Sequence, residues 1–525
     1  MSRRTVIGAG AAIAASAAAG CSTGNGDSPK SSGSGSGTAA MSHTTGMGGS
    51  ARGPSATTWS ALARGLDGKL LRPGDNDWAA ARQLYNTRFD KLKPSAVAYV
   101  ATAADIRECL TFAKRHHTPL AIRNGGHSYG GWSSGNDRLI VDVSKMKSVR
   151  VSAGTATIGA GAKLIDVYRA LAAKGVTIPA GSCPSVGISG LTLGGGQGVT
   201  SRAYGLTCDS LTQATIITAD GKQLTCNDRE NADLFWALRG AGNGNFGVVT
   251  ELRFRTHPAP RAVTAYMTWP WSKAATVLKA WQKWGPAQPD EIWSSLHLDA
   301  AAGRTPTVSV AAFSLGTYGE LQNAVDRLAD GPGGPGSASN VSLRRRSYLE
   351  AMEIYAGCAG FADDDQCHLP GAVPGRDTAG ALGRETYAAG SDFFDRSLSD
   401  AGVRALLGRV AGVRGGSGAV TLTALGGAVN RVDPTATAFV HRRSKVLAQY
   451  IGAWRAGTSG SAVREWLGGT RAAMRPYASG AAYQNYADPT LSGWRSAYYG
   501  PAADRLTKLK KQYDPGRVFD FPQAL

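Results

Sequence analysis

Cysteine and charge are both scarce in this sequence, and each shortage excludes a class of protein. Seven cysteines occur among 525 residues, and no two of them have the CxxC spacing typical of a structural zinc site. No metal centre is therefore expected. Charged residues make up 18% of the chain, below the ~25% typical of soluble proteins. With 42% hydrophobic residues and 69 glycines, the composition favours a loop-rich enzyme over a coiled coil or a disordered chain.

Acidic residues are scarcer than basic ones, 38 against 57, which gives a net charge of +19. The basic residues are scattered along the chain, and their densest run is only Arg344–Arg346. Surfaces that bind single-stranded nucleic acid interleave clustered basic residues with stacking aromatic residues. That pattern is not present, so no nucleic-acid partner is expected. The charge more simply supports solubility, anionic ligands or attraction to an anionic surface.

The apolar run near the N-terminus is too short for a membrane span. It extends from Thr5 to Gly20, whereas a spanning helix needs ~20 residues. The run follows Arg3-Arg4 and precedes Cys21, so residues 1–21 are expected to be a signal peptide of the twin-arginine type. Cys21 is either the lipidated first residue of a lipoprotein or is lost by ordinary cleavage. We therefore expect an exported protein, secreted or anchored to a membrane through lipidated Cys21.

Two cysteine pairs are candidate disulfides in a compartment outside the cytoplasm. Cys358 and Cys367 lie nine residues apart in a loop-like stretch, and Cys208 and Cys226 form the second candidate pair. The sequence alone does not decide which pairs form.

A Gly/Ser linker is expected over 22–57, and the pattern becomes globular after it. The next part favours strands and single helices, and the part after residue 262 mixes amphipathic helices with alternating strands. The predicted elements are strands near 97–101, 120–123, 139–143, 148–152 and 155–160, helices over 105–116, 162–174, 275–284 and 321–328, and a hairpin around 219–221.

Two glycine-rich runs match a dinucleotide fingerprint only superficially. GAGAAI (8–13) lies in the expected signal peptide and lacks the third glycine. GNGNFG (242–247) matches G-x-G-x-x-G, whose mechanism requires a strand before it and a helix N-terminus after it. Here helix-like ADLFWALRG precedes the run and strand-like VVTELRFRT follows it. A Rossmann site is therefore not expected.

Two other glycine-rich loops each carry one reactive side chain. RNGGHSYGGW (123–132) places His127 among four glycines, and PAGSCPSVGISGLTLGGGQG (179–198) places Cys183 before a glycine-dense run. Glycines let consecutive backbone N–H groups approach pyrophosphate oxygens closely. An imidazole and a thiol are thus expected beside a bound cofactor.

These loops resemble motifs of the berberine-bridge-enzyme-like branch of the vanillyl-alcohol-oxidase flavoprotein superfamily. The resemblance runs from about residue 90 to the C-terminus and includes LFWALRGAGNGNFGVVTELRFRTHP, GGAVNRVDPTATAFVHR and a tail that begins YQNYADPTLSGW. It implies an α+β fold of two domains, of the PCMH type that binds FAD. Residues 58–262 would form the FAD-binding domain, 263–478 a substrate domain built on an antiparallel sheet covered by helices, and 479–525 a tail that completes the first domain.

The resemblance also implies how FAD is held. In that family the loop histidine is bonded to the flavin 8α-methyl group, which maps to His127. In its bicovalent members the loop cysteine is bonded to flavin C6, which maps to Cys183. Related sequences often have histidine where Leu191 stands, so the pocket beside the flavin is expected to differ in shape. The other cofactor-binding residues expected are Arg123, Asn124, Gly125, Gly126, Ser128, Gly187, Gly190, Leu193, Gly194, Gly198, Val248, Val249, Asn485 and Tyr486.

A base that accepts a substrate proton would ease hydride transfer to the flavin. Tyr483 and Tyr486 in YQNY are the candidates, and Tyr483 is preferred because the family's catalytic tyrosine sits in this motif. The reference pKa of tyrosine is ~10, so a base role needs nearby positive charge or hydrogen-bond donors. The alternative role for both residues is aromatic packing against the cofactor.

The expected function is a FAD-dependent oxidase. It takes hydride from a hydroxyl- or amine-bearing carbon of a sugar, alcohol or secondary metabolite and passes the electrons to molecular oxygen, giving H2O2. Two alternatives stay open, a flavin dehydrogenase with another electron acceptor and a non-catalytic, lipid-anchored binding protein. The sequence does not identify the substrate.

Overall fold

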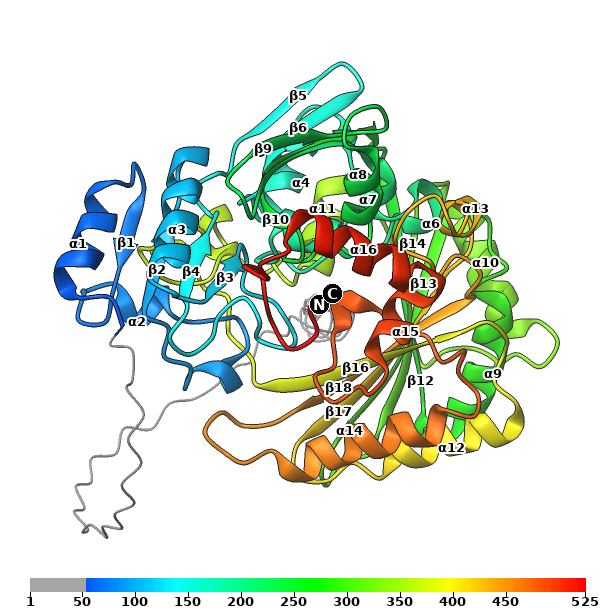
Figure 1. Ribbon diagram of the computed structural model, residues 1–525. Coiled ribbons are helices and arrows are strands. Elements are labelled where there is room, and N and C mark those ends of the chain that lie inside the picture. Colours follow the sequence, from blue (N-terminus) through cyan, green and yellow to red (C-terminus); the bar gives the residue numbers. More distant parts are fainter. Residues whose placement is uncertain (1–52) are drawn as a thin grey trace, which may run out of the picture.

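The computed structural model describes residues 53–525, which form two β-rich units and a C-terminal segment that returns between them (Figure 1). The expected signal peptide with Cys21, and residues 22–52 of the expected linker, lie outside the described residues. The first helix, α1 (Ala56–Arg64), includes the last two residues of the predicted linker. The Ser55 hydroxyl sets this start, because it accepts a hydrogen bond from the N–H of Thr58.

The first unit opens with a mixed four-stranded sheet in the order β1-β2-β4-β3. Its strands are β1 (Lys69–Leu71), β2 (Ala96–Tyr99), β3 (Leu120–Arg123) and β4 (Leu139–Asp142). Because β2, β4 and β3 run parallel, the chain must cross over between β2 and β3, and it does so through α3 (Ala103–Arg115). This helix buries Ile106, Cys109 and Leu110, which recur at helical spacing. The predicted strand–helix–strand order is confirmed.

A second, antiparallel sheet completes the β-structure of this unit, in the order β5-β6-β10-β8-β9. Its strands are β5 (Val149–Ser152), β6 (Thr155–Gly159), β8 (Leu211–Thr218), β9 (Gln223–Cys226) and β10 (Gly247–Arg255). The predicted hairpin is confirmed at β8–β9, where the Asp220 carboxylate accepts hydrogen bonds from the Thr218 hydroxyl and the Lys222 N–H. The predicted helix over 162–174 is α4 (Leu164–Ala172).

The GNGNFG run has the inverted order that the sequence predicts. It follows α8 (Ala232–Leu238) and leads into β10. The run is therefore followed by a strand and not by the helix N-terminus that a dinucleotide fingerprint requires.

The second unit is built on a seven-stranded antiparallel sheet in the order β15-β12-β14-β13-β17-β18-β16. Its strands are β12 (Ala262–Trp269), β13 (Ile292–Ala301), β14 (Thr307–Ser314), β15 (Asn340–Arg346), β16 (Tyr387–Phe394), β17 (Ser417–Ala424) and β18 (Val446–Ala453). One face packs against α9 (Ala274–Trp284), α10 (Tyr318–Asp330), α12 (Asp400–Ala411) and α14 (Ser461–Met474). Figure 1 shows α12 and α14 lying along this face, away from the first unit.

One of the two candidate disulfides is present in the structure. Cys358 and Cys367 are bonded in the stretch that follows α11 (Tyr348–Tyr355). Cys208 and Cys226 are both buried free thiols, so the second pairing is wrong. Its physical reason is the register of the β8–β9 hairpin, which places Cys226 opposite Ala214 rather than beside Cys208.

The C-terminal segment lies between the two units (Figure 1). It contains α15 (Trp494–Tyr499) and α16 (Ala503–Tyr513). The buried Lys510 ammonium donates to the carbonyls of Asn245 and Phe519 and to the Asp514 carboxylate, each at 2.7 Å. The segment is thereby tied to the turn before β10.

The other helices and strands are short. They are α2 (Trp78–Ala81), η2 (Thr87–Phe89), β7 (Val176–Thr177), α5 (Ile188–Leu193), α6 (Ser201–Tyr204), α7 (Thr207–Ser210), β11 (His257–Pro258), η3 (Trp271–Lys273), η4 (Asp364–Cys367), α13 (Ala428–Arg431), η5 (Gln484–Tyr486) and η6 (Gly500–Ala502). Within residues 53–525, no helix has the length and apolar character needed to cross a bilayer. The same residues contain no cluster of His, Cys, Asp or Glu suited to a metal ion.

Candidate cofactor and active site

A cavity of about 350 Å³ lies where the first unit, the seven-stranded sheet and the C-terminal segment meet. Its walls come from the loop after β3, the stretch around α5, the turn before β10, the sheet and the C-terminal segment. The lining residues include Asn124, Gly125, His127, Ser128, Tyr129, Ser133, Cys183, Gly187, Gly190, Asn243, Val249, Trp293, Ser295, His297, Thr421, Gln449, Gln484, Asn485, Tyr486 and Gln523.

The two glycine-rich loops predicted to hold the cofactor meet at this cavity, backbone against backbone. A Cβ on Gly125 would lie 2.5 Å from the carbonyl oxygen of Ser185 and 2.6 Å from the nitrogen of Gly187. A Cβ on Gly187 would collide with the side chain of Asn124. Glycine is therefore required at both positions, because a side chain at either would separate the loops.

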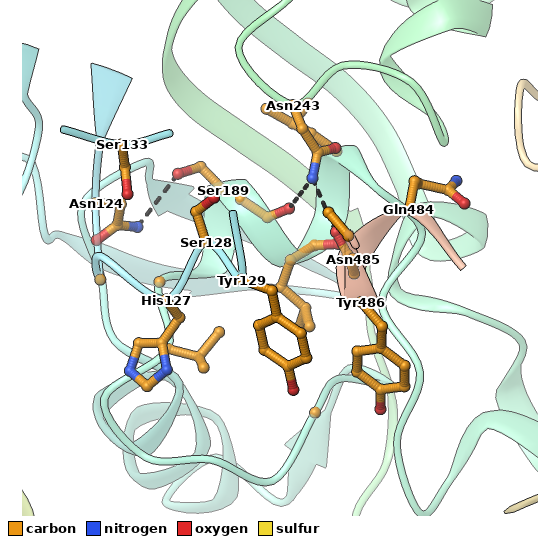
Figure 2. Close-up of a pocket in the computed structure, with 18 of the residues that line it drawn as sticks. Asn124, His127, Ser128, Tyr129, Ser133, Ser189, Asn243, Gln484, Asn485 and Tyr486 are labelled. Atoms are coloured by element: carbon orange, nitrogen blue, oxygen red, sulfur yellow. Dashed lines mark hydrogen bonds between the residues drawn. The ribbon is translucent and has the colours of Figure 1, made fainter. Parts of the chain in front are cut away.

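A hydrogen-bonded amide and a buried ammonium lock the loops in this contact. The Asn124 amide nitrogen donates to the Ser189 hydroxyl at 3.2 Å, as Figure 2 shows. Its amide oxygen accepts from the Lys163 ammonium at 2.6 Å, and that ammonium also donates to Ser144 at 3.0 Å. Burial lowers the pKa of Lys163 to about 8.

His127 projects from the first loop into the cavity (Figure 2). Its Nε2 lies 2.9 Å from the Ser185 hydroxyl, and its Nδ1 has no hydrogen-bond partner among the described residues. Burial, assisted by the positive charge of Lys163, lowers the pKa of His127 to about 3. The imidazole is therefore neutral at physiological pH, which leaves one ring nitrogen with a lone pair. Cys183 lines the same cavity from the second loop.

Unpaired polar atoms in the cavity wall fit the chemistry of FAD. Ser133 Oγ, Asn243 Oδ1, Gln484 Oε1 and Gln523 Oε1 are buried and have no hydrogen-bond partner among the described residues. Three of these are amide oxygens, which accept hydrogen bonds from N–H and O–H groups. The flavin ring, the ribityl chain and adenine supply such donors. No Lys or Arg of the described chain lines the cavity, so the backbone N–H groups of the glycine loops would hold the pyrophosphate.

The two tyrosines of YQNY occupy different environments. Tyr486 lines the cavity and stacks on Tyr129, with ring centroids 5.5 Å apart (Figure 2). Burial raises the pKa of Tyr486 to about 12. Tyr483 lies behind the cavity wall, packed edge-to-face against Phe393 and Phe439.

The oxygen of Tyr483 is already engaged. It accepts hydrogen bonds from the N–H of Gly196 and from the Asn485 amide, each at 2.8 Å. Asn485 in turn accepts from the Asn243 amide at 2.8 Å. The geometry therefore favours Tyr486 over Tyr483 as the residue that meets a substrate.

A polar row crosses the face of the seven-stranded sheet that points toward the cavity. Strand pairing aligns one polar residue from each strand, namely Asn340, Thr268, Ser309, His297, Thr421, Gln449 and Ser391. Three adjacent members, His297, Thr421 and Gln449, line the cavity. Gln449 donates to the Tyr129 hydroxyl at 2.7 Å, which connects this floor to the tyrosine pair. Neighbouring Ser295 lies 2.8 Å from His297 Nε2.

Four of the predicted site residues do not line the cavity. Arg123 is turned beneath its loop, where it pairs with Asp142. Gly194 is covered by the side chains of Asn485 and Asn243, and Tyr483 lies behind the wall. Val248 faces the opposite side of β10 from Val249, because successive side chains of a strand alternate.

The other predicted residues do line it, and they are His127, Cys183, Asn124, Gly125, Gly126, Ser128, Gly187, Gly190, Leu193, Gly198, Val249, Asn485 and Tyr486. Sequence reasoning missed Ser185, Asn243 and Gln484, although all three lie inside the motifs quoted for the resemblance. It also missed His297, Thr421 and Gln449, for which the sequence carries no shared motif.

Comparison with known proteins places this chain beside flavin enzymes. The family described as "FAD binding domain" matches residues 94–227, and the family described as "Berberine and berberine like" matches residues 482–525. The uncharacterized FAD-linked oxidoreductase YgaK of Bacillus subtilis is 32% identical over 467 residues, which cover 88% of this chain and 97% of that protein.

Two further relatives bear on the fold and the chemistry. The solved structure of Physcomitrella patens BBE-like 1 superposes with a TM-score of 0.80 at 30% identity, covering 89% of this chain and 98% of that one. The chitooligosaccharide oxidase of Gibberella zeae is 28% identical over 482 residues, covering 86% of this chain and 91% of that protein.

The contact between the two loops leads to a testable prediction. In Gly125→Ala the new methyl group would meet two backbone atoms that cannot move independently, so we expect the purified protein to contain less than about a tenth of the normal FAD. The measurement is the ratio of flavin to protein absorbance. Gly408→Ala in α12 is the control, because a Cβ at that position would meet no atom within 4 Å and its FAD content should be normal. Normal FAD content in Gly125→Ala would contradict the proposed role of the loop contact.

Proposed function

Because this chain belongs to the berberine-bridge-enzyme-like family of FAD-linked oxidoreductases, we propose that it is an oxidase of a neutral, hydroxyl-bearing substrate, with O2 as the electron acceptor. FAD supplies the hydride acceptor when bound. The observation that carries the proposal is that the Tyr486 phenol and the polar sheet residues face the same cavity as His127 and Cys183.

The character of the cavity wall supports a neutral substrate. Among the described lining residues, Asp520 is the only carboxylate and none is Lys or Arg. The sheet floor offers hydroxyl, amide and imidazole groups, while Tyr129, Tyr355 and Trp293 offer aromatic faces. Trp293 Nε1 is buried and has no partner among the described residues, so it is available to a substrate oxygen. Hydroxylated rings, as in sugars, match this combination, and the relatives named as chitooligosaccharide and xylooligosaccharide oxidases agree with it.

The chain's own residues would assist the reaction by moving one proton. A substrate hydroxyl over the sheet floor would give its proton to the phenolate form of Tyr486, and bound FAD would supply the acceptor for the hydride of the adjacent C–H bond. Tyr129 orients Tyr486 through ring stacking, and Gln449 holds Tyr129 in turn. Aromatic walls around this group exclude water from the reacting atoms.

The first test is turnover. Anaerobic mixing with neutral oligosaccharides should bleach the flavin absorbance at 450 nm, and admitting air should restore it with formation of one H2O2 per cycle. Tyr486→Phe should slow the bleaching by about 10²–10⁴-fold, the usual contribution of a general base. Bleaching that air does not reverse, but that a redox dye does, would instead indicate a dehydrogenase. No bleaching by any neutral hydroxylated compound would contradict the proposal.

The pH dependence of bleaching follows from the pKa of Tyr486. A base must be deprotonated to accept a proton, and burial raises this pKa to about 12. The phenolate fraction and the bleaching rate should therefore rise steadily from pH 7 to pH 10 in the wild type. The rise should disappear in Tyr486→Phe and persist in Tyr483→Phe, the matched control whose hydroxyl does not reach the cavity.

We further propose that FAD is attached to both His127 Nδ1 and the Cys183 sulfur, at the 8α-methyl group and at C6. Attachment at His127 replaces one C–H and one N–H bond, and the two electrons and two protons released reduce one O2 to H2O2. Attachment at Cys183 starts from the reduced thiol, replaces one C–H and one S–H bond, and reduces a second O2 to H2O2 in the same way. Two attachments would fix the tilt of the ring relative to the substrate. The Cys183 sulfur forms one such bond only, so a disulfide at this position and a flavin bond exclude one another.

Acid precipitation tests this attachment. We expect the pellet to stay yellow for the wild type, His127→Ala and Cys183→Ala, and to turn white for the double variant. Peptide mass spectrometry should find FAD on the peptides that contain His127 and Cys183. Release of FAD from the wild type into the acid supernatant, or a disulfide on the Cys183 peptide, would contradict double attachment.

We also propose export through the N-terminal segment, supported by Arg3-Arg4, the apolar run to Gly20 and Cys21. Fractionation of cells that express the full chain should recover folded, FAD-loaded protein outside the cytoplasm. Arg3-Arg4→Lys-Lys should retain it inside, and Cys21→Ala should release a membrane-bound form. Equal distribution of all three forms would exclude this route.

A further inference from the structure

The His127 ring is held on two sides by residues that sequence reasoning did not single out. Its ring stacks on Tyr85, with centroids 4.1 Å apart and an interplanar angle of 20°. The Ser185 hydroxyl lies 2.9 Å from Nε2. The N–H of Tyr85 also donates to the carbonyl of Gly126 at 3.1 Å, which ties the stacking residue to the same loop.

These contacts fix both the plane of the His127 ring and the edge that the ring presents to Ser185. Rotation about χ2 is broad and nearly two-fold for histidine, so an unrestrained ring exchanges its two nitrogen-bearing edges. Stacking on Tyr85 fixes the plane of the ring, and the Ser185 hydroxyl selects the edge that carries Nε2. The opposite edge, which carries Nδ1, is left free of this contact in a ring that lines the cavity.

Ser185 and Tyr85 come from parts of the chain far apart in sequence. Ser185 lies two residues after Cys183, in the loop that Gly125 contacts, and Tyr85 lies just before η2. Both side chains are buried, at 3% and 2% exposure, so neither contact is loosened by water. Burial lowers the pKa of His127, which keeps the ring neutral and leaves one of its nitrogens with a lone pair.

We propose that Ser185 and Tyr85 are positioning residues for flavin attachment: together they orient the neutral imidazole of His127 so that Nδ1 points at the flavin. This inference rests on the proposed attachment through His127. Neither residue lines the cavity, so neither is assigned a role in turnover.

The test uses the full chain with Cys183→Ala, so that His127 is the only attachment residue. Total FAD is measured by absorbance of the native protein, and covalent FAD by absorbance of the acid pellet, during incubation with added FAD in air. Ser185→Ala should slow the growth of the covalent fraction about fivefold, as expected for loss of one hydrogen bond, without lowering total FAD. Tyr85→Leu should slow it similarly, while Ser185→Thr and Tyr85→Phe should remain close to the parent.

Ser201→Ala is the matched control, because its buried hydroxyl also accepts one hydrogen bond, from the N–H of Gly198, but lies outside the cavity lining. The site of linkage gives a second readout. Proteolysis and NMR of the histidyl-flavin peptide should find only the Nδ1 isomer in the parent and an added Nε2 isomer in Ser185→Ala.

Three outcomes would overturn the inference. Unchanged attachment and a single isomer in both Ser185→Ala and Tyr85→Leu would remove the positioning role. Loss of total FAD, rather than of the covalent fraction alone, would assign these residues a structural role. Acid release of FAD from the Cys183→Ala parent would contradict attachment through His127 as well, whereas normal attachment in the parent confines a failure to the two positioning residues.

Discussion

The rest of the site depends on one contact, in which two loops meet at positions that have no side chain. Gly125 lies against the backbone of Ser185 and Gly187, and any Cβ there would push the loops apart. That approach is what brings His127 within hydrogen-bond distance of Ser185 and places Cys183 on the same cavity. The buried Lys163 ammonium then stabilises the contact from behind through Asn124. Geometry and electrostatics are thus linked, because the cation that locks the loops also helps keep the imidazole neutral.

The two faces of the seven-stranded sheet have different roles, because one packs in the core of the second unit and the other lines the cavity. Leu296, Leu298 and Leu422 face the covering helices and belong to their core. The alternate residues His297 and Thr421 face the cavity, because strand side chains point to opposite faces in turn. Substitutions of the cavity-facing strand residues therefore change the surface that a ligand meets without disturbing the helix-facing core. The two glycine loops remain free to hold the cofactor in one geometry.

The sequence predicts the cofactor half of the site much better than the substrate half. The α+β fold, the FAD cofactor and the enzymatic class are confirmed, and the loop residues that carry the resemblance, from Asn124 to Gly198, mostly line the cavity. These residues lie in short contiguous motifs whose function depends on local backbone geometry. His297 lies more than a hundred residues before Thr421 and Gln449 in the sequence. Only the strand register brings the three into one row. Register depends on the whole sheet, which local patterns do not specify.

Local sequence also does not distinguish Tyr483 from Tyr486, although the two residues lie only three positions apart. Residues three apart in a 3₁₀ turn lie on one side of it, and the centroids of the two tyrosine rings are 4.9 Å apart. Sequence spacing therefore makes both tyrosines equivalent, and their surroundings distinguish them. Two donors already fill the Tyr483 oxygen, one of them from the glycine run at Gly196. Tyr483 thereby ties the C-terminal segment to the glycine run and fixes the turn from which Tyr486 faces the cavity.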